Sequence, residues 1–174
     1  LFTLAEATYG AGKGIQSVFG VILGTGIGGG LTYSQDLISS QNGAFLEWGH
    51  LEAEPGGEQC HCGSRGCYKT VISGPALENY YFEKTGQVLP LVEISKLAEN
   101  NKDPNASETM SRFITFLVGG LKSAITIIDP DIVVIGGGLS NIEVIYTQAI
   151  PALRKSLPLS KSSIVISRST LGDS

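Results

Sequence analysis

The chain has 174 residues, of which 42% are hydrophobic and 16% are charged, a length that allows one sizeable buried core but not two. The formal net charge is −4 and the basic residues are dispersed, which disfavours nucleic acid and membrane surfaces as partners. We expect no membrane segment, because the longest apolar runs are far shorter than the roughly 20 residues that a spanning helix needs. An odd number of clustered cysteines and the lack of an export pattern favour reduced thiols in a cytoplasmic protein.

Strands and helices are both predicted along the chain. Strands rich in β-branched residues are predicted over residues 17–24, 31–34, 131–137 and 162–167. Helices are predicted over residues 1–9 (with Leu1, Leu4 and Ala5 on one face), 74–86, 91–100, 106–128 and 141–157. The stretch 44–54 is expected to be extended. The fourth helix, which Asn105 or Ser107 could cap, is apolar on nearly all sides after Phe113 and should be buried, while Pro151 interrupts the last helix. This order predicts an α/β domain with a mixed sheet covered by helices.

The three cysteines fall within one short segment, C-H-C-G-S-R-G-C. In an extended chain Cys60 and Cys62 point the same way, so that their two sulfurs can share one ion. Gly63 and Gly66 allow the backbone to fold back and bring Cys67 to the same place. The segment therefore predicts a metal-binding loop, although three unrelated buried thiols are the alternative.

A tetrahedral site needs a fourth ligand, and the chain has two histidines. His61 is sterically awkward because it lies between two ligands, whereas His50, ten residues before Cys60, can return to the cluster. The resulting Cys₃His set fits a structural Zn²⁺ site. It leaves no open position for water, so we expect the metal to shape the protein rather than to react.

Two glycine runs follow predicted strands. The first, G-T-G-I-G-G-G, contains G-x-G-x-x-G, but the helix that a dinucleotide-binding fold requires does not follow. We instead predict a hairpin whose amides bind phosphate, with a tight β-turn as the alternative. The second run lies at the carboxyl end of a strand, where α/β sheets bind ligands, so both runs could contact one nucleotide. The predicted nucleotide-binding residues are Gly24, Thr25, Gly26, Gly28, Gly29, Gly30, Gly136, Gly137 and Gly138.

These elements occur in the order GTGIGGG, LEWGH, CHCGSRGC and DPDIVVIGGGLS. Together they resemble the C-terminal lobe of the ROK family (repressor, open reading frame, kinase), and the resemblance extends over the whole chain. It implies an actin-like, ribonuclease H-like fold of two α/β lobes around a cleft, with a zinc knuckle inserted in this lobe. Residues 1–174 would then form the C-terminal lobe, without the N-terminal lobe and the final helix, and residues 1–12 would end the connecting helix.

The resemblance also implies roles for individual residues. It implies that Glu47 and His50 bind sugar hydroxyls. His50 would do so through the ring nitrogen that does not bind zinc. The family's catalytic aspartate should lie just before Leu1, so we expect no catalytic residue within the chain. Lys69 stands where the family commonly has a sugar-binding glutamate, which leaves the sugar undefined. The implied zinc ligands are His50, Cys60, Cys62 and Cys67.

The function that the resemblance implies is an ATP-dependent kinase of a hexose or an N-acetylhexosamine. Such an enzyme transfers a phosphoryl group in line from Mg-ATP to a sugar hydroxyl, mainly by positioning and charge neutralisation. A cytoplasmic homodimer is expected, and these residues alone should be inactive. A ROK-type transcriptional regulator that senses a sugar and a zinc-knuckle interaction module without catalysis are the alternatives.

Overall fold

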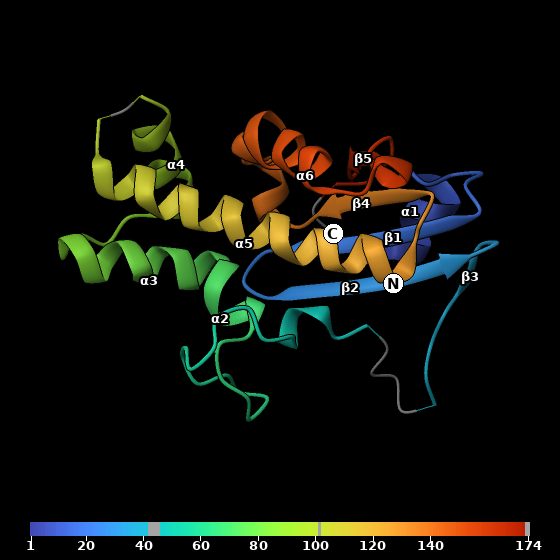
Figure 1. Ribbon diagram of the computed structural model, residues 1–174, viewed down its shortest axis with the longest axis horizontal. Coiled ribbons are helices and arrows are strands. Elements are labelled where there is room, and N and C mark those ends of the chain that lie inside the picture. The colour runs from blue at the N-terminus through green and yellow to red at the C-terminus, as the bar shows by residue number, and fades with distance from the viewer. Residues whose placement is uncertain (42–45, 101, 173–174) are drawn as a thin grey trace.

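The computed structural model describes residues 1–41, 46–100 and 102–172. These residues form one mixed sheet with the strand order β3-β2-β1-β4-β5 (Figure 1). Strand β1 pairs antiparallel with β2 and parallel with β4, and β4 pairs parallel with β5. The strands are β1 (Ser17–Leu23), β2 (Ile27–Tyr33), β3 (Asp36–Leu37), β4 (Ile132–Gly136) and β5 (Val165–Arg168). The predicted mixed sheet is therefore confirmed.

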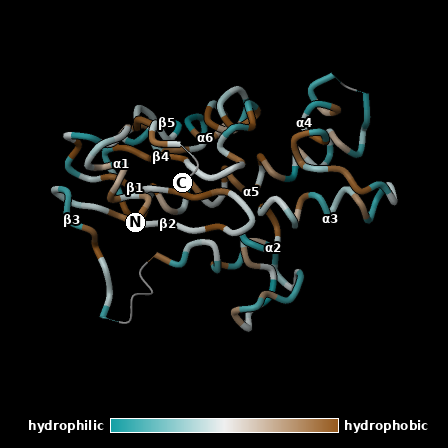
Figure 2. Tube along the Cα trace, turned by 180° about the vertical axis from the view of Figure 1, so that it is seen from behind, coloured by the Kyte–Doolittle hydropathy of each residue, from teal (hydrophilic) through white to brown (hydrophobic). Residues whose placement is uncertain are grey.

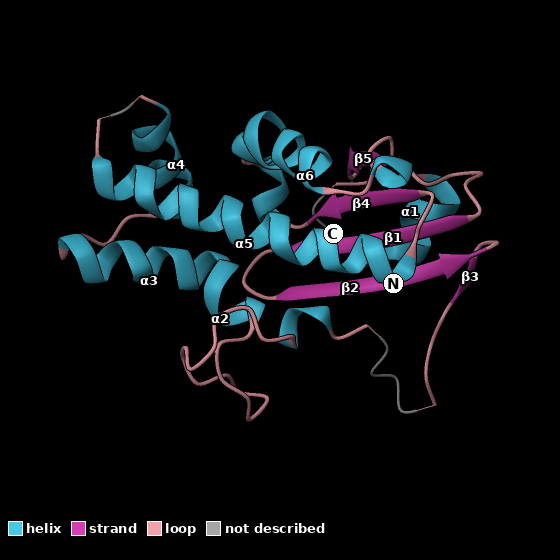
Figure 3. Ribbon diagram, in the orientation of Figure 1, coloured by secondary structure: helices cyan, strands magenta, loops and turns pink. Residues whose placement is uncertain are grey.

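Helices cover both faces of the sheet (Figure 3). The α-helices are α1 (Phe2–Tyr9), α2 (Tyr68–Ile72), α3 (Gly74–Thr85), α4 (Leu91–Glu99), α5 (Pro104–Ile128) and α6 (Ile150–Ser156). Shorter 3₁₀ or π turns lie over Trp48–His50, Gly138–Asn141, Ile145–Ala149 and Leu159–Lys161. Helix α5 packs on the face that carries Phe19 and Val133, and α1 on the face that carries Val18 and Val134. Because both faces are covered, β1 and β4 are continuous apolar runs, which Figure 2 shows along the central strands.

The long helix differs from its prediction in two ways. It begins at Pro104, and its N-cap is Asp103, whose carboxylate accepts hydrogen bonds from the amides of Asn105 and Ala106. Its buried residues form one stripe, and Ile127 on the other side is 81% exposed, so the expected all-round burial is wrong. Among the described helices, α5 alone is long and apolar enough to cross a membrane by length and composition. Its stripe packs into the main core, as in a core helix.

Three further expectations need correction. Gly28, Gly29 and Gly30 belong to strand β2 rather than to a turn. Within the stretch expected to be extended, residues 44 and 45 lie outside the described residues, and Trp48–His50 is a 3₁₀ turn. In α1, Leu1 is 99% exposed, and the buried face instead carries Thr3, Glu6 and Ala7.

Glycines in β2 allow close packing on both faces of the strand. A Cβ at Gly29 would come within 2.6 Å of Trp48, and one at Gly30 within 2.6 Å of Thr3. The last helix is not broken at Pro151 but is irregular just before it: a π turn over Ile145–Ala149 continues directly into α6, and Pro151 lies in the first turn of α6.

Candidate metal centre and nucleotide pocket

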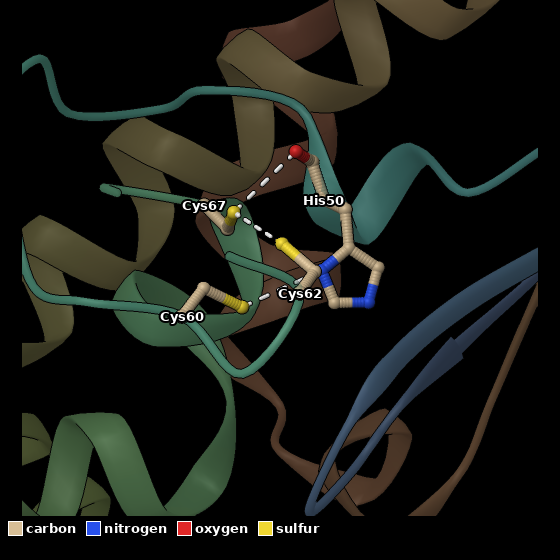
Figure 4. Close-up of side chains that lie close together, drawn as sticks. All are labelled: His50, Cys60, Cys62 and Cys67. Atoms are coloured by element: carbon tan, nitrogen blue, oxygen red, sulfur yellow. Dashed lines mark hydrogen bonds between the residues drawn. The ribbon is translucent and has the colours of Figure 1, made fainter. Parts of the chain in front are cut away.

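The fold brings His50, Cys60, Cys62 and Cys67 together (Figure 4). Their ligand atoms all lie within 4.8 Å of one another. His50 Nδ1 lies 3.5 Å from Cys60 Sγ, and Cys62 Sγ lies 3.6 Å from Cys67 Sγ. His50 ends a 3₁₀ turn, and Cys67 is the N-cap of α2. The four ligands expected from the sequence thus form one cluster.

The spacing of this cluster fits a tetrahedral zinc ion. Zn–S bonds of about 2.3 Å and Zn–N bonds of about 2.0 Å place neighbouring ligand atoms of a tetrahedron roughly 3.5–3.8 Å apart. The two ligand separations of 3.5 and 3.6 Å agree with this range, and the three thiols are free of disulfides. The donor set of three sulfurs and one imidazole nitrogen is also typical of structural zinc. The cluster is therefore compatible with zinc.

The thiols of the cluster differ in acidity. A backbone hydrogen bond from Ser64 is the largest cause that lowers the pKa of Cys62, to about 6. Burial is the largest cause that raises the pKa of Cys67, to about 12. A buried thiolate needs a positive charge beside it, so a divalent cation would favour ionisation of Cys67.

His50 presents different groups to its two sides. Its Nδ1 is turned toward the sulfurs, while Nε2 points away from them (Figure 4) and lies 3.8 Å from Glu47 Oε2. The side chain of Glu47 is 60% exposed, so its carboxylate remains accessible to a ligand. His50 can therefore bind a metal through Nδ1 while its Nε2, together with Glu47, forms hydrogen bonds with another ligand.

The cysteine loop is closed by its own backbone. The amides of Ala53 and Glu54 both donate to the carbonyl of Gly66, at 2.7 and 3.0 Å. Gly66 has a φ of +66°, and a Cβ there would overlap the carbonyl oxygen of Glu54. The amide of Cys60 donates to Ser64 O at 2.8 Å, which closes a turn that contains Cys62. Only glycine fits at position 66 in this arrangement.

His61 and Lys69 lie beside the four-residue cluster. The ring of His61 lies edge-on to that of His50, with centroids 5.0 Å apart, and its Nδ1 lies 3.6 Å from Cys60 Sγ. Lys69 Nζ also contacts this Nδ1, at 3.1 Å. His61 is exposed and lies outside the four-residue cluster, as its position between two ligands predicted.

A cavity of about 700 Å³ opens at the carboxyl ends of β1 and β4. Three glycine segments meet there: the amide of Gly74 donates to Gly24 O at 2.9 Å, and a Cβ at Gly24 would lie 4.0 Å from the amide nitrogen of Gly138. The two glycine runs are thus neighbours, joined by the start of α3. The cavity is lined by Phe2, Ile22, Gly24, Thr25, Gly26, Ile27, Gly28, Gly74, Pro75, Glu78, Leu91, Gly137, Gly138 and Leu139.

Three predicted nucleotide-binding residues do not line this cavity, namely Gly29, Gly30 and Gly136. A Cβ at Gly136 would lie 2.4 Å from the ring of Phe2, so this position requires glycine for packing. Gly29 and Gly30 likewise leave space for Trp48 and Thr3. Sequence reasoning in turn missed the part of the lining that α3 and α4 contribute. Ser73 with Pro75 is a recognisable helix start, but nothing local shows that this helix faces the glycine runs.

Comparison with known proteins agrees with these features. The family model described as "ROK family" matches residues 1–172. The N-acetyl-D-glucosamine kinase of Pectobacterium carotovorum subsp. carotovorum (strain PC1) is 35% identical over 172 residues, which cover 92% of this chain and 56% of that protein. The kinase of the same name from Yersinia enterocolitica serotype O:8 is 38% identical over 168 residues, or 90% and 54% of the two chains. The chain spans about half the length of these curated relatives.

Solved structures give the fold. The ROK hexokinase from Thermus thermophilus has a TM-score of 0.83 and 28% identity, covering 98% of this chain and 59% of that one. A ROK family glucokinase from Streptomyces griseus, solved with glucose and AMPPNP, has the same TM-score and identity over 99% and 62% of the two chains. A ROK family transcriptional regulator also has a TM-score of 0.83, but at 23% identity it shows the fold alone. The α/β fold is that of the actin-like ROK kinases, and the chain belongs to the ROK family.

Proposed function

We propose that the protein phosphorylates a hexose or an N-acetylhexosamine with Mg-ATP. The position of Thr25 supports this function most directly, because Thr25 lines both the 700 Å³ cavity and a smaller cavity of about 230 Å³. Cys60 and His61 of the cysteine loop (residues 60–67) and Lys69 of α2 line the smaller cavity. The hairpin residue thus lies between a nucleotide-sized pocket and the loop of the metal cluster. Relatives named N-acetyl-D-glucosamine kinase, 32–38% identical, support the same reaction.

In this proposal the nucleotide occupies the larger cavity. The backbone amides of Gly26 and Gly138 face a ligand without side chains in the way and can donate to its phosphates, whereas the amide of Gly24 is bonded to Gly26 O. Mg²⁺, brought with the nucleotide, neutralises phosphate charge when bound. Gly29, Gly30 and Gly136 then act indirectly, because their close packing fixes the strands from which the phosphate-binding turns extend.

The metal cluster serves the sugar side. A structural Zn²⁺ held by His50, Cys60, Cys62 and Cys67 would fix the 3₁₀ turn that carries the sugar-facing residues. Glu47 accepts hydrogen bonds from sugar hydroxyls, and His50 contributes its Nε2. With four protein ligands the ion has no open position, so it orients these groups and takes no part in phosphoryl transfer.

The curated relatives are nearly twice as long as this chain, so the proposed kinase includes a further lobe. We place residues 1–174 in the C-terminal lobe of a cytoplasmic, homodimeric two-lobed kinase that uses neither nucleic acid nor membrane as a partner. In this reaction an aspartate takes the proton of the attacking hydroxyl, and we assign no residue of this chain to that role. A regulator that only senses a sugar is the second candidate, because the ROK regulator has the same fold.

A coupled assay of ADP release tests the proposal. The natural protein is incubated with Mg-ATP and a panel of glucose, mannose, fructose, N-acetylglucosamine and N-acetylmannosamine. The expected result is sugar-dependent ADP release with at least one sugar, reduced strongly in Glu47→Gln. No ADP release with any of these sugars would rule out the proposed kinase, and sugar-dependent DNA binding in its place would identify the regulator.

A further inference from the structure

Glu78 contributes the only charged side chain among the described residues that line the 700 Å³ cavity. The rest of the lining is glycine backbone, Thr25 and apolar side chains. A lone carboxylate in a site proposed for a polyanion is unexpected, because it repels phosphate. Its presence therefore calls for a ligand group that donates hydrogen bonds.

The carboxylate is held in place by the neighbouring helix. Glu78 Oε1 accepts a hydrogen bond from the amide of Leu91, at 2.8 Å. Leu91 is the first residue of α4, and the N-cap, Pro90, makes no side-chain cap. Glu78 thus satisfies a free amide at a helix start, where negative charge is also favoured. This capping bond uses one oxygen and fixes the orientation of the other.

The second oxygen, Oε2, has no protein hydrogen bond or ion pair among the described contacts of this half-buried residue. A carboxylate oxygen only accepts hydrogen bonds, so its ligand must be a donor such as a hydroxyl or an amine. A carboxylate that was needed only to cap α4 would not have to line the cavity.

The position of Glu78 separates it from the phosphate end of the cavity. Gly74 contacts Gly24 in the first glycine turn, and Glu78 follows four residues later on the same helix. Four residues advance an α-helix by about 6 Å, so Glu78 is attached to α3 about 6 Å farther along the helix than Gly74. Apolar residues flank it, Pro75 on the same helix and Leu91 on the next.

We infer that Glu78 binds the ribose hydroxyls of the nucleotide, an inference that rests on the proposed function. Phosphates lie on the glycine turns, the base lies against the apolar walls, and the vicinal diol between them donates to the fixed carboxylate. An acidic side chain reads ribose in the same way in other nucleotide-binding folds. Glu78 is then a residue that makes the site prefer ribonucleotides.

The test compares nucleotides and variants in one cycle. Dissociation constants of Mg²⁺ complexes of ATP, 2′-deoxyATP and 3′-deoxyATP are measured for the natural protein and for Glu78→Gln, Glu78→Ala and Glu83→Gln. Glu83 is the matched control, since it lies on the same helix and bonds Asn79 outside this cavity. The natural protein and Glu83→Gln should bind at least one deoxynucleotide about tenfold or more weakly than ATP, because a hydrogen bond to a charged group is lost.

The variants should remove this discrimination. Glu78→Gln keeps an acceptor for Leu91 and should reduce the preference to about threefold, since an amide makes only a neutral hydrogen bond. Glu78→Ala should abolish it, and the Gln variant suffices if the Ala variant does not fold. Equal binding of ATP and both deoxynucleotides by the natural protein, discrimination retained in a folded Glu78→Ala, or an effect on Mg²⁺ dependence alone would overturn the inference. If no nucleotide binds at all, the proposed function fails first and the inference falls with it.

Discussion

The guanidinium of Arg112 on α5 donates two hydrogen bonds to the carboxylate of Glu54, at 3.0 and 2.8 Å. The same guanidinium lies over the rings of Tyr80 and Phe116, at 4.8 and 4.9 Å from their centroids. The backbone of Glu54 in turn bonds to Gly66, next to Cys67. This chain of contacts fastens the cysteine loop to the longest described helix and fixes the position of one sulfur.

Removing Arg112 should therefore loosen the metal cluster. Arg112→Ala is expected to weaken zinc binding by roughly tenfold or more, as loss of supporting contacts around metal ligands does. Arg112→Lys should recover little, because a lysine cannot make the two parallel bonds. Zinc affinity is measured by competition with a chelator, with the exposed Arg154→Ala as the control. Unchanged affinity in Arg112→Ala would show that the loop does not depend on α5.

Two glycines of the cysteine loop form a matched pair. Gly63 and Gly66 both have positive φ, +95° and +66°, but a Cβ at Gly63 meets nothing within 4 Å, whereas one at Gly66 overlaps Glu54 O. Gly63→Ala should lower the free energy of unfolding by only about 1–2 kcal/mol, because the new side chain strains the backbone but meets no neighbour. Gly66→Ala should also displace the backbone beside Cys67 and lower zinc affinity more than tenfold. Chelator competition distinguishes the two, and equal effects would argue against the loop geometry described.

Glu6 should stabilise the fold above acidic pH. It is fully buried, and its carboxylate accepts hydrogen bonds from Ser169 Oγ at 2.6 Å and from the amides of Ala11 and Leu171 at 2.8 and 3.0 Å. Burial acts to raise the pKa of Glu6, but these bonds outweigh it and hold the pKa below the usual 4.5. The folded state thus binds this proton less readily than the unfolded state, so the stabilisation is present above about pH 4.5 and is lost as the pH falls through the lower, folded-state pKa.

The variant Glu6→Gln tests this account. At pH 7 its free energy of unfolding should be about 1–3 kcal/mol lower, because an amide oxygen and nitrogen cannot accept from all the donors. Below pH 4.5 the difference should shrink, since the natural protein loses the same interactions. Urea unfolding at several pH values measures it, and a difference that is constant from pH 7 to pH 3 would contradict the assignment.

Gly26 should be needed for nucleotide binding but not for folding. A Cβ at this position meets nothing within 4 Å, and the residue lines the large cavity. Gly26→Val should therefore leave the thermal unfolding midpoint nearly unchanged while reducing ATP affinity by about tenfold or more, because its side chain occupies space meant for phosphate. Normal ATP affinity in the folded variant would place the phosphates elsewhere.

Local patterns in the sequence were sufficient for much of the fold. Strand β4, and β1 except near Ser17 and Ile22, are buried on both faces, so their apolar runs identify them. The metal cluster is nearly contiguous in sequence apart from His50. Elsewhere the prediction was wrong where contacts between residues far apart in the sequence determine the structure. The buried face of α1 is set by Glu6 with Ser169, a pairing across almost the whole chain that no helical periodicity reveals. Gly29 was predicted to lie in a turn, but it belongs to β2 and leaves space for Trp48. Trp48 comes from another segment, so the local sequence does not reveal this packing.

The short helix α2 and the position of Glu78 in the cavity wall were missed for the same reason. Helix α2 has five residues and starts at the N-cap Cys67, so the fold of the cysteine loop sets it more than its own propensity does. Nothing in the sequence around Glu78 indicates a ligand contact, because only the packing of α3 beside α4 brings this residue to the cavity.

The zinc content of the purified natural protein, measured by elemental analysis together with X-ray absorption at the zinc edge, tests the central claim most directly. We predict one zinc per chain with three sulfurs and one nitrogen around it, the nitrogen being lost in His50→Ala. A protein that folds and phosphorylates sugar with less than about a tenth of an equivalent of zinc would contradict the claim that the ion shapes the sugar site.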